Sequence, residues 1–228
     1  MNASRRAPRP WQPDWYVLSG LARAIRAALA PLELRGRRVL DFGCGERPYE
    51  PWFVAAGARY SGADLGGGHE VAIAADGGLG AVDASADLVA SFQVLEHVWD
   101  VPRYLREAHR VLAPGGWLLL STHGVWLYHP HPGDYRRWTG EGLKREVEAG
   151  GFALQTMQAV AGPLAWTTVL RAVGLCYFLR RVPLAGALLA AAAACLFSSK
   201  AWLEDRLTPR TVVDDNACVY VALFRRVP

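Results

Sequence analysis

The chain has 228 residues, of which 52% are hydrophobic, and a formal net charge of +4. This length and composition suit one domain with an insertion better than two domains. The basic residues are scattered apart from a group at Arg5, Arg6 and Arg9 and the pair Arg180 and Arg181. That distribution argues against nucleic acid as a partner, since a nucleic-acid groove gathers its cations on one face.

Four cysteines occur, at Cys44, Cys176, Cys195 and Cys218, and no CxxC pair or other short metal-ligand spacing is present. They predict reduced, mostly buried thiols, no metal centre and a cytoplasmic location. The N-terminus holds Arg, Pro and Trp without the apolar stretch of a signal peptide, so secretion is not expected.

Short apolar strands are expected to alternate with helices along the chain. Residues 1–35 predict one helix, from an N-cap at Ser19 to about Ala30, where Pro31 stops it. Further strands are expected from Val39 and at 59–65, 71–75, 87–92, 117–121, 152–160 and 217–224, with helices at 51–56, 102–112 and 141–149. Such alternation is typical of βαβ units and of a parallel sheet covered on both faces.

The stretch VLDFGCG, residues 39–45, is an apolar run that ends in Asp-x-Gly-x-Gly. It predicts a buried strand that feeds a tight turn, where Gly43 and Gly45 let the backbone approach a ligand closely. The next predicted strand contains Asp64, 23 positions after Asp41. This is the spacing expected for a carboxylate that binds the ribose hydroxyls of a nucleotide-like cofactor.

Residues 162–215 interrupt the pattern with two apolar helices, expected at 164–179 and 182–197 and joined at Arg180 and Arg181. The second is shorter than the roughly 20 residues that a bilayer-spanning helix needs. Two alternatives stay open: a cap that closes the substrate pocket, or a hairpin that contacts the inner face of the membrane through 164–202. In the second, the hairpin dips into one bilayer leaflet with Arg180 and Arg181 at the headgroups, and Trp166 and Trp202 lie near the interface.

Four motifs occur in order: VLDFGCGERPY, YSGADL, DLVASFQVLEHVWD and LREAHRVLAPGGWLLLST. Together they resemble the successive motifs of class I S-adenosylmethionine-dependent methyltransferases, of the small-molecule, UbiE-like type. The resemblance covers roughly residues 37–160 and resumes at 217–226. It implies a Rossmann-like, doubly wound α/β sheet of seven strands with an antiparallel last strand, built from 36–161 and 216–228, and it makes 162–215 a helical insertion.

The resemblance also implies S-adenosylmethionine as the cofactor and assigns residues to it. The loop would comprise Asp41, Gly43 and Gly45, and the ribose would be held by Asp64 beside Leu65. Asp76 and Gly77 would lie near the adenine, and Phe92 and Gln93 would face the cofactor. Many relatives carry a third glycine where this chain has Arg47.

Methyl transfer from a sulfonium needs alignment of the reactants more than it needs a metal, whereas a hydroxyl acceptor also needs a base. The loop after the fifth predicted strand, 123–139, would hang over the pocket, because ligands bind outside the carboxyl ends of such strands. His129 or His131 is the expected general base, oriented by Asp134 or Tyr135. The alternative is that these residues only hold the loop in place.

The stretch from His129 to Thr139 resembles a segment of methyltransferases linked to sugar-polymer and glycolipid biosynthesis, which implies a small-molecule, sugar or lipid-linked acceptor. Glu96 and His97 either touch the site or form a surface pair. A nicotinamide-dinucleotide oxidoreductase fits poorly, since its fingerprint needs a glycine where Pro48 stands. A non-catalytic S-adenosylmethionine-binding scaffold is the second alternative, and the sequence does not indicate an oligomeric state.

Overall fold

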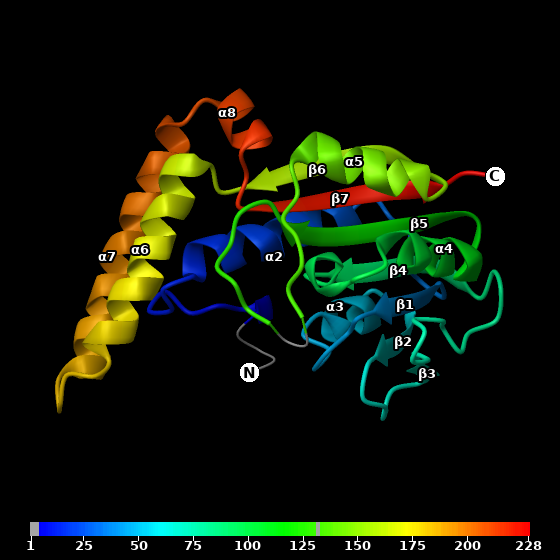
Figure 1. The fold of residues 1–228 in the computed structure, drawn as a ribbon, viewed down its shortest axis with the longest axis horizontal. Helices are drawn as coiled ribbons and strands as arrows, with labels where there is room; N and C mark the ends of the chain where they lie inside the picture. Colours follow the sequence, from blue (N-terminus) through cyan, green and yellow to red (C-terminus); the bar gives the residue numbers. More distant parts are fainter. Residues whose placement is uncertain (1–4, 131–132) are drawn as a thin grey trace.

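A sheet of seven strands lies at the centre of the molecule (Figure 1). The computed structural model describes residues 5–130 and 133–228. The strand order is β3-β2-β1-β4-β5-β7-β6, with bounds β1 Arg38–Phe42, β2 Arg59–Asp64, β3 Val71–Ala72, β4 Ala86–Phe92, β5 Leu112–His123, β6 Phe152–Val160 and β7 Val219–Arg226. Neighbouring strands from β3 to β5 are parallel, whereas β7 is antiparallel to β5 and β6. This topology confirms the predicted fold.

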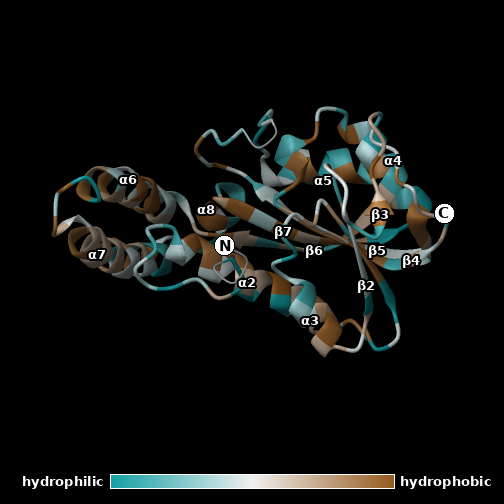
Figure 2. Cartoon of the chain, turned by 90° about the horizontal axis from the view of Figure 1, so that it is seen from below, coloured by the Kyte–Doolittle hydropathy of each residue, from teal (hydrophilic) through white to brown (hydrophobic). Residues whose placement is uncertain are grey.

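Helices cover both faces of the sheet. Their bounds are α2 Trp15–Leu29, α3 Glu50–Ala55, α4 Val101–Val111, α5 Gly140–Ala149, α6 Pro163–Leu179, α7 Gly186–Leu207 and α8 Arg210–Asp215, with a 3-10 turn η1 at Leu95–His97. One face packs against α2, α3 and the base of α6 and α7, and the other packs against α4 and α5. Figure 2 shows these two layers on opposite sides of the strands.

The central strands are apolar on both sides, as β5 illustrates. Leu118 and Leu120 pack toward α4 and α5, while Leu119 between them packs toward α2, and all three are buried. Successive side chains of a strand point to opposite faces. An uninterrupted apolar run therefore fits a strand that is covered on both faces, which is why the sequence pattern identified this strand correctly.

The first helix begins earlier than predicted, at Trp15 rather than after Ser19. Tyr16 and Val17 belong to the buried core, so packing on the sheet extends the helix toward the N-terminus. Asp14 precedes the helix but makes no side-chain capping hydrogen bond. Burial of these two side chains therefore outweighs the capping preference on which the prediction rested.

Several other boundaries also differ from the prediction. β5 begins at Leu112, so Pro114 lies inside the strand, in a stretch where the register with β4 shifts. β3 is limited to Val71–Ala72, α7 begins and ends later than 182–197, and the sequence did not predict α8. The shift in register accommodates the Pro-Gly-Gly sequence that was expected to separate the helix from the strand.

α6 and α7 form a hairpin that extends away from the sheet (Figures 1 and 2). The buried side of α7 carries a small residue at every fourth position: Gly186, Ala190, Ala194 and Ser198. Such residues let two helices approach closely. The Cys176 thiol on α6 accordingly donates a hydrogen bond to the backbone oxygen of Ala190 over 3.3 Å.

The base of the hairpin is fastened to α2. The hydroxyl of Tyr16 donates to Asp205 Oδ2 over 2.7 Å, and Asp205 Oδ1 accepts from the backbone N–H of Gly162 over 2.6 Å. Within residues 5–130 and 133–228, α7 is the one helix whose length and composition would let it cross a membrane. Most of its surface lies outside the core, since only 28% of that apolar window is buried.

Tyr104→Phe tests the polar link between α4 and the sheet. The Tyr104 hydroxyl donates to the Phe42 carbonyl over 3.0 Å and bonds to the Ser91 hydroxyl over 2.8 Å. Its removal leaves two buried polar groups without this partner, so the free energy of unfolding should fall by about 1–3 kcal/mol in denaturant titrations. Tyr128→Phe is the control, because Tyr128 is exposed; an equal loss in both variants would contradict the assignment.

Candidate active site

A cavity of about 930 Å³ lies at the carboxyl ends of β1, β2, β4 and β5. It brings together all nine residues that the sequence assigned to the cofactor: Asp41, Gly43, Gly45, Asp64, Leu65, Asp76, Gly77, Phe92 and Gln93. They come from four separate stretches of the chain and meet because parallel strands end at one edge of the sheet. Their individual roles toward the cofactor stay predictions.

The loop after β1 is folded tightly against the end of β2. The backbone N–H groups of Gly43 and Cys44 both donate to the carbonyl of Ala63, over 2.8 and 3.1 Å. Gly43 has a φ of +88°, and a Cβ there would lie 2.5 Å from a side-chain atom of Val94. Only glycine fits this position, as the Asp-x-Gly-x-Gly pattern predicted.

Arg47 stands where many relatives have glycine, and its backbone has a φ of +57°. The positive φ explains why glycine is favoured at this position. The Arg47 side chain turns away from the cavity wall and forms two hydrogen bonds of 2.8 Å with Glu70. Glu70 also accepts from the backbone N–H of Gly62, so the departure from the family pattern fastens the loop to β2 without filling the cavity.

Asp64 lies at the end of β2 with its carboxylate beside the loop. Its Oδ2 accepts from the backbone N–H of Gly45 over 2.5 Å, and its Oδ1 accepts from that of Leu65 over 2.7 Å. Asp76 forms an ion pair with Arg103 on α4, at 2.7 Å. Arg103 also lines the cavity, and the sequence reasoning did not identify it.

Asp41 is buried under the loop, at 2% exposure. Its carboxylate accepts a hydrogen bond from the Tyr60 hydroxyl over 2.7 Å. Burial raises the pKa of Asp41 to about 7, although the Tyr60 bond acts in the opposite direction. The Asp41 side chain therefore supports the loop from inside the protein. It holds its proton more tightly than an exposed carboxyl group does.

Beyond the loop, His123 and His129 line the cavity, and together with the buried Glu96 they form a cluster. Glu96 belongs to η1 after β4, His123 ends β5, and His129 lies in the following loop. Glu96 Oε1 lies 3.5 Å from His123 Nε2, while its Oε2 accepts from the Thr122 hydroxyl over 2.8 Å. Each of the three residues offers one atom that could bind a metal ion, and these three atoms all lie within 4.8 Å of one another.

Burial dominates the charges of this cluster. It raises the pKa of Glu96, and it lowers the pKa of His123 well below its ordinary value. The His123 ring stacks on Trp126, with centroids 5.4 Å apart and planes 6° from parallel. Neutral forms of both groups are thus favoured, and the His123 ring is fixed by stacking.

His129 is oriented by Asp134, as one of the two predicted alternatives stated. Asp134 accepts from the backbone N–H of His129 over 2.9 Å, and its Oδ2 lies 3.3 Å from His129 Nδ1. The Arg137 guanidinium donates to both carboxylate oxygens, at 2.5 and 2.7 Å, and holds the pKa of Asp134 below its usual range. These bonds also hold the loop in place, as the alternative stated, and the role of His129 as a base stays a prediction.

Tyr135, the other predicted orienting residue, makes different contacts. Its backbone N–H donates to the carbonyl of Glu96 over 2.9 Å, and its ring meets Trp99 edge to face at 5.2 Å. The structure therefore assigns the orientation of His129 to Asp134 rather than to Tyr135. His131 lies outside the described residues.

The sequence reasoning did not single out His123, and it left Glu96 undecided between a surface pair and the site. The structure buries Glu96 completely. The sequence positions of Glu96 and His123 could nevertheless have indicated the site, because Glu96 follows β4 and His123 ends the neighbouring strand β5. Residues that follow adjacent parallel strands meet at one edge of the sheet.

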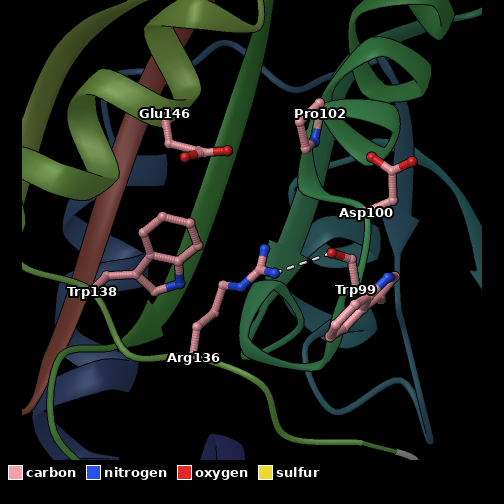
Figure 3. Close-up of a pocket in the computed structure, with 6 residues that line it drawn as sticks. All are labelled: Trp99, Asp100, Pro102, Arg136, Trp138 and Glu146. Atoms are coloured by element: carbon pink, nitrogen blue, oxygen red, sulfur yellow. Dashed lines mark hydrogen bonds between the residues drawn. The ribbon is translucent and has the colours of Figure 1, made fainter.

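A second, open hollow adjoins the cavity and is drawn in Figure 3. It is lined by Trp99, Asp100, Pro102, Arg136, Trp138 and Glu146. Trp99 and Asp100 line both spaces, so the hollow continues the cavity outward. Arg136 lies between the two indole rings and donates to the Trp99 carbonyl over 3.1 Å.

The hairpin of α6 and α7 contributes no residue to either space. The lining of these two spaces therefore gives no support to a cap over the substrate pocket, and that alternative stays a prediction. The wall beside the hairpin is formed instead by the N-terminal segment and α2, through residues such as Gln12, Val17 and Leu21. The unusual early start of α2 thus completes the cavity.

A family model described as a methyltransferase domain matches residues 15–176. The chain belongs to this family. The membership confirms the predicted resemblance to class I methyltransferases, whose cofactor is S-adenosylmethionine. The site fits that cofactor, because the glycine loop leaves room for a nucleoside and the Asp64 carboxylate can bind its ribose hydroxyls.

A probable S-adenosylmethionine-dependent methyltransferase of Mycolicibacterium smegmatis is 32% identical over 143 aligned positions, which cover 53% of this chain and 53% of that protein. A ubiquinone biosynthesis O-methyltransferase of Xanthomonas oryzae is 34% identical over 109 positions, or 41% of this chain and 46% of that protein. The chain thus spans about half the length of these relatives or less.

A solved S-adenosylmethionine-dependent methyltransferase from Mesorhizobium loti superimposes with a TM-score of 0.56. The match covers 91% of this chain and 98% of the other, at 18% identity. At this identity the likeness concerns the fold, and it agrees with the seven-stranded sheet described above.

Asp41→Asn tests the support under the loop through pH. Because the folded pKa of Asp41, about 7, exceeds the ordinary value, the folded state holds the proton more tightly than the unfolded chain. The stabilisation is fully present below about pH 4 and is lost as the pH rises toward 7. Asp41→Asn should lack this decline when the free energy of unfolding is measured at a series of pH values.

The control for this experiment is Asp83→Asn, at an exposed carboxylate that pairs with Arg110. It should retain the decline of the wild-type protein. A wild-type profile that rises or stays flat across this interval would contradict the burial argument.

Proposed function

We propose that the protein is an S-adenosylmethionine-dependent methyltransferase that methylates a hydroxyl group of a small-molecule, sugar or lipid-linked acceptor. One observation carries the proposal: the cavity joins the predicted cofactor residues to His123 and His129, which form a cluster with the buried Glu96. A methyl donor and a group that handles a hydroxyl proton can therefore act in the same space. The name of the O-methyltransferase relative supports an oxygen acceptor.

The bound cofactor supplies an activated methyl group with a neutral leaving group. The chain contributes alignment: the loop at Gly43 and Gly45 and the carboxylate of Asp64 would fix the donor, while His123 and His129 border the space left for the acceptor. Positioning of two reactants in this way can contribute up to about 7–11 kcal/mol in the best intramolecular cases.

His129 is the proposed proton acceptor. Its Nδ1 lies 2.9 Å from the carbonyl of Leu127 and 3.3 Å from Asp134 Oδ2. Both neighbours are acceptors, so Nδ1 carries the proton and Nε2 keeps a free lone pair. Asp134 would also stabilise the imidazolium that forms, since it is held as a carboxylate by Arg137.

The hollow of Figure 3 supports a polyhydroxylated acceptor. Trp99 and Trp138 offer flat apolar faces, and Arg136 and Glu146 offer a donor and an acceptor to hydroxyl groups. The charged groups of the lining are the carboxylates of Asp100 and Glu146 and the guanidinium of Arg136. This balance favours a neutral sugar-like group over an anionic one at this position.

His129→Gln tests the proposed chemistry. Protein incubated with methyl-labelled S-adenosylmethionine and fractionated cell extract should transfer label to a lipid, glycan or small-metabolite fraction. His129→Gln should lower that rate by about 10²- to 10⁴-fold, the usual contribution of a general base, with the affinity for the cofactor unchanged.

Val82→Gln, at an exposed position away from the cavity, is the control and should transfer label at the wild-type rate. Cofactor binding without label in any fraction would favour the non-catalytic alternative. Stabilisation by a nicotinamide dinucleotide, and none by S-adenosylmethionine, would favour the oxidoreductase.

We also propose that the hairpin contacts the cytoplasmic face of a membrane, where a lipid-linked acceptor would be found. No acidic residue occurs from 149 to 203, whereas four cations do: Arg171, Arg180, Arg181 and Lys200. An excess of cations beside apolar residues suits the anionic surface of that leaflet. The four cysteines are free thiols, in keeping with a cytoplasmic location.

Exposed leucines form a stripe along α7, spaced at seven, seven and four residues. Leu189, Leu196, Leu203 and Leu207 are 44%, 69%, 52% and 72% exposed. At 100° per residue these positions fall within about 40° of one another. The stripe supports contact along the length of the helix, and the Arg180–Arg181 pair at the tip disfavours insertion of the tip into hydrocarbon.

Replacement of Leu189, Leu196 and Leu203 together by Gln tests the membrane contact. Full burial of a leucine contributes about 1.5–3 kcal/mol, so the affinity for liposomes with anionic lipids should fall at least tenfold in sedimentation assays. Val54→Gln with Val82→Gln, two exposed positions away from the hairpin, should bind as the wild-type protein does. Wild-type protein that ignores such liposomes would refute the contact.

A further inference from the structure

We infer that the buried Glu96, together with His123 and His129, which line the cavity, forms a binding site for one divalent transition-metal ion, such as Zn²⁺ or Mn²⁺. The three residues offer one carboxylate oxygen and two imidazole nitrogens within 4.8 Å of one another. The role of the ion in activating an acceptor hydroxyl rests on the proposed function, whereas the binding of the ion does not.

The separation of two donor atoms already matches ion coordination. Glu96 Oε1 and His123 Nε2 lie 3.5 Å apart. Two ligands of a tetrahedral ion at bond lengths of about 2.0–2.1 Å lie about 3.3 Å from each other. The 3.5 Å between Glu96 Oε1 and His123 Nε2 is longer than a good charge-assisted hydrogen bond, and it suits an ion bound between the two atoms.

Glu96 presents an oxygen without a hydrogen-bond partner among the described residues. The side chain is completely buried, and Thr122 satisfies only Oε2. An isolated carboxylate oxygen in such a position is costly unless a cation or a donor reaches it. An ion between Oε1 and the two histidines would satisfy it.

The contacts of His129 prepare it as a ligand. The carbonyl of Leu127 and the carboxylate of Asp134 flank Nδ1, so the lone pair of Nε2 is free. An imidazole held by a carboxylate in this way is the usual outer support of a metal-binding histidine. Arg137 in turn fixes Asp134.

The ligand set indicates the class of ion. Two imidazoles and one carboxylate suit zinc, iron, manganese or cobalt, whereas Ca²⁺ and Mg²⁺ prefer oxygen ligands throughout. Three protein ligands leave at least one position open, as in catalytic sites. That position would face the cavity, since His123 and His129 both line it.

At the open position the ion would act on the acceptor hydroxyl. A cation lowers the pKa of a neighbouring hydroxyl group, so the hydroxyl proton would leave to water near neutral pH. His129 would then hold the ion, and its role as the proton acceptor would apply to the protein without an ion. The oxygen produced in this way would be ready for methyl transfer.

Calorimetric titration of chelator-treated protein with Zn²⁺ or Mn²⁺, without cofactor or acceptor, tests the site. We expect one ion per chain, with an affinity at least tenfold weaker in Glu96→Gln and in His129→Gln. Asp134→Asn should weaken it by about 10- to 100-fold, because it removes the support of His129. With Co²⁺ in place of Zn²⁺, a visible absorption band should appear and be lost in the same variants.

His109→Gln is the matched control, because His109 bonds to the carbonyl of Val227 at the other end of the sheet. It should bind the ion as the wild-type protein does, and His129→Gln, at a loop position, keeps the test valid if Glu96→Gln does not fold. No binding at millimolar ion, or equal affinity in all variants, would overturn the inference.

The experiments distinguish failure of the metal site from failure of the proposed methyltransferase function. Methyl transfer by a protein that binds no ion would overturn the metal site and leave His129 as the base. Ion binding at the three residues without methyl transfer would support the site and refute the proposed function.

Discussion

The structure depends on the way in which the chain turns after β1. Two backbone N–H groups, of Gly43 and Cys44, share the carbonyl of Ala63 at the end of β2, and Asp41 supports the turn from below. The shared carbonyl places the loop beside Asp64, whose carboxylate binds the backbone of Gly45. A bulkier residue at Gly43 would collide with Val94, so the loop, the Asp64 carboxylate and the segment after β4 are coupled by direct contact.

The sheet and the cofactor side of the cavity were predictable from local patterns. Apolar runs such as Leu118 to Leu120 identify strands buried on both faces, and glycine spacing identifies the loop. Each of these signals lies within a few neighbouring residues. Boundaries were less predictable because packing decides them, as at Tyr16 and Val17, whose burial extends α2.

The side of the cavity that we propose for the acceptor was harder to predict, because it is assembled from distant parts of the chain. Glu96 and His123 are 27 positions apart and are brought together only by the pairing of β4 with β5. The choice of Asp134 over Tyr135 depends on the direction of side chains in an irregular loop. The position of the hairpin was unpredictable for the same reason, since the sequence shows that 162–215 is apolar and helical but not which way the hairpin leaves the sheet.

The hydrogen bond from Tyr16 to Asp205 joins α7 to a helix whose next turn borders the cavity. A hairpin lying on a bilayer would therefore hold the cavity at a fixed height and tilt above the lipid headgroups. An acceptor anchored by its lipid tail would then be found by diffusion in two dimensions.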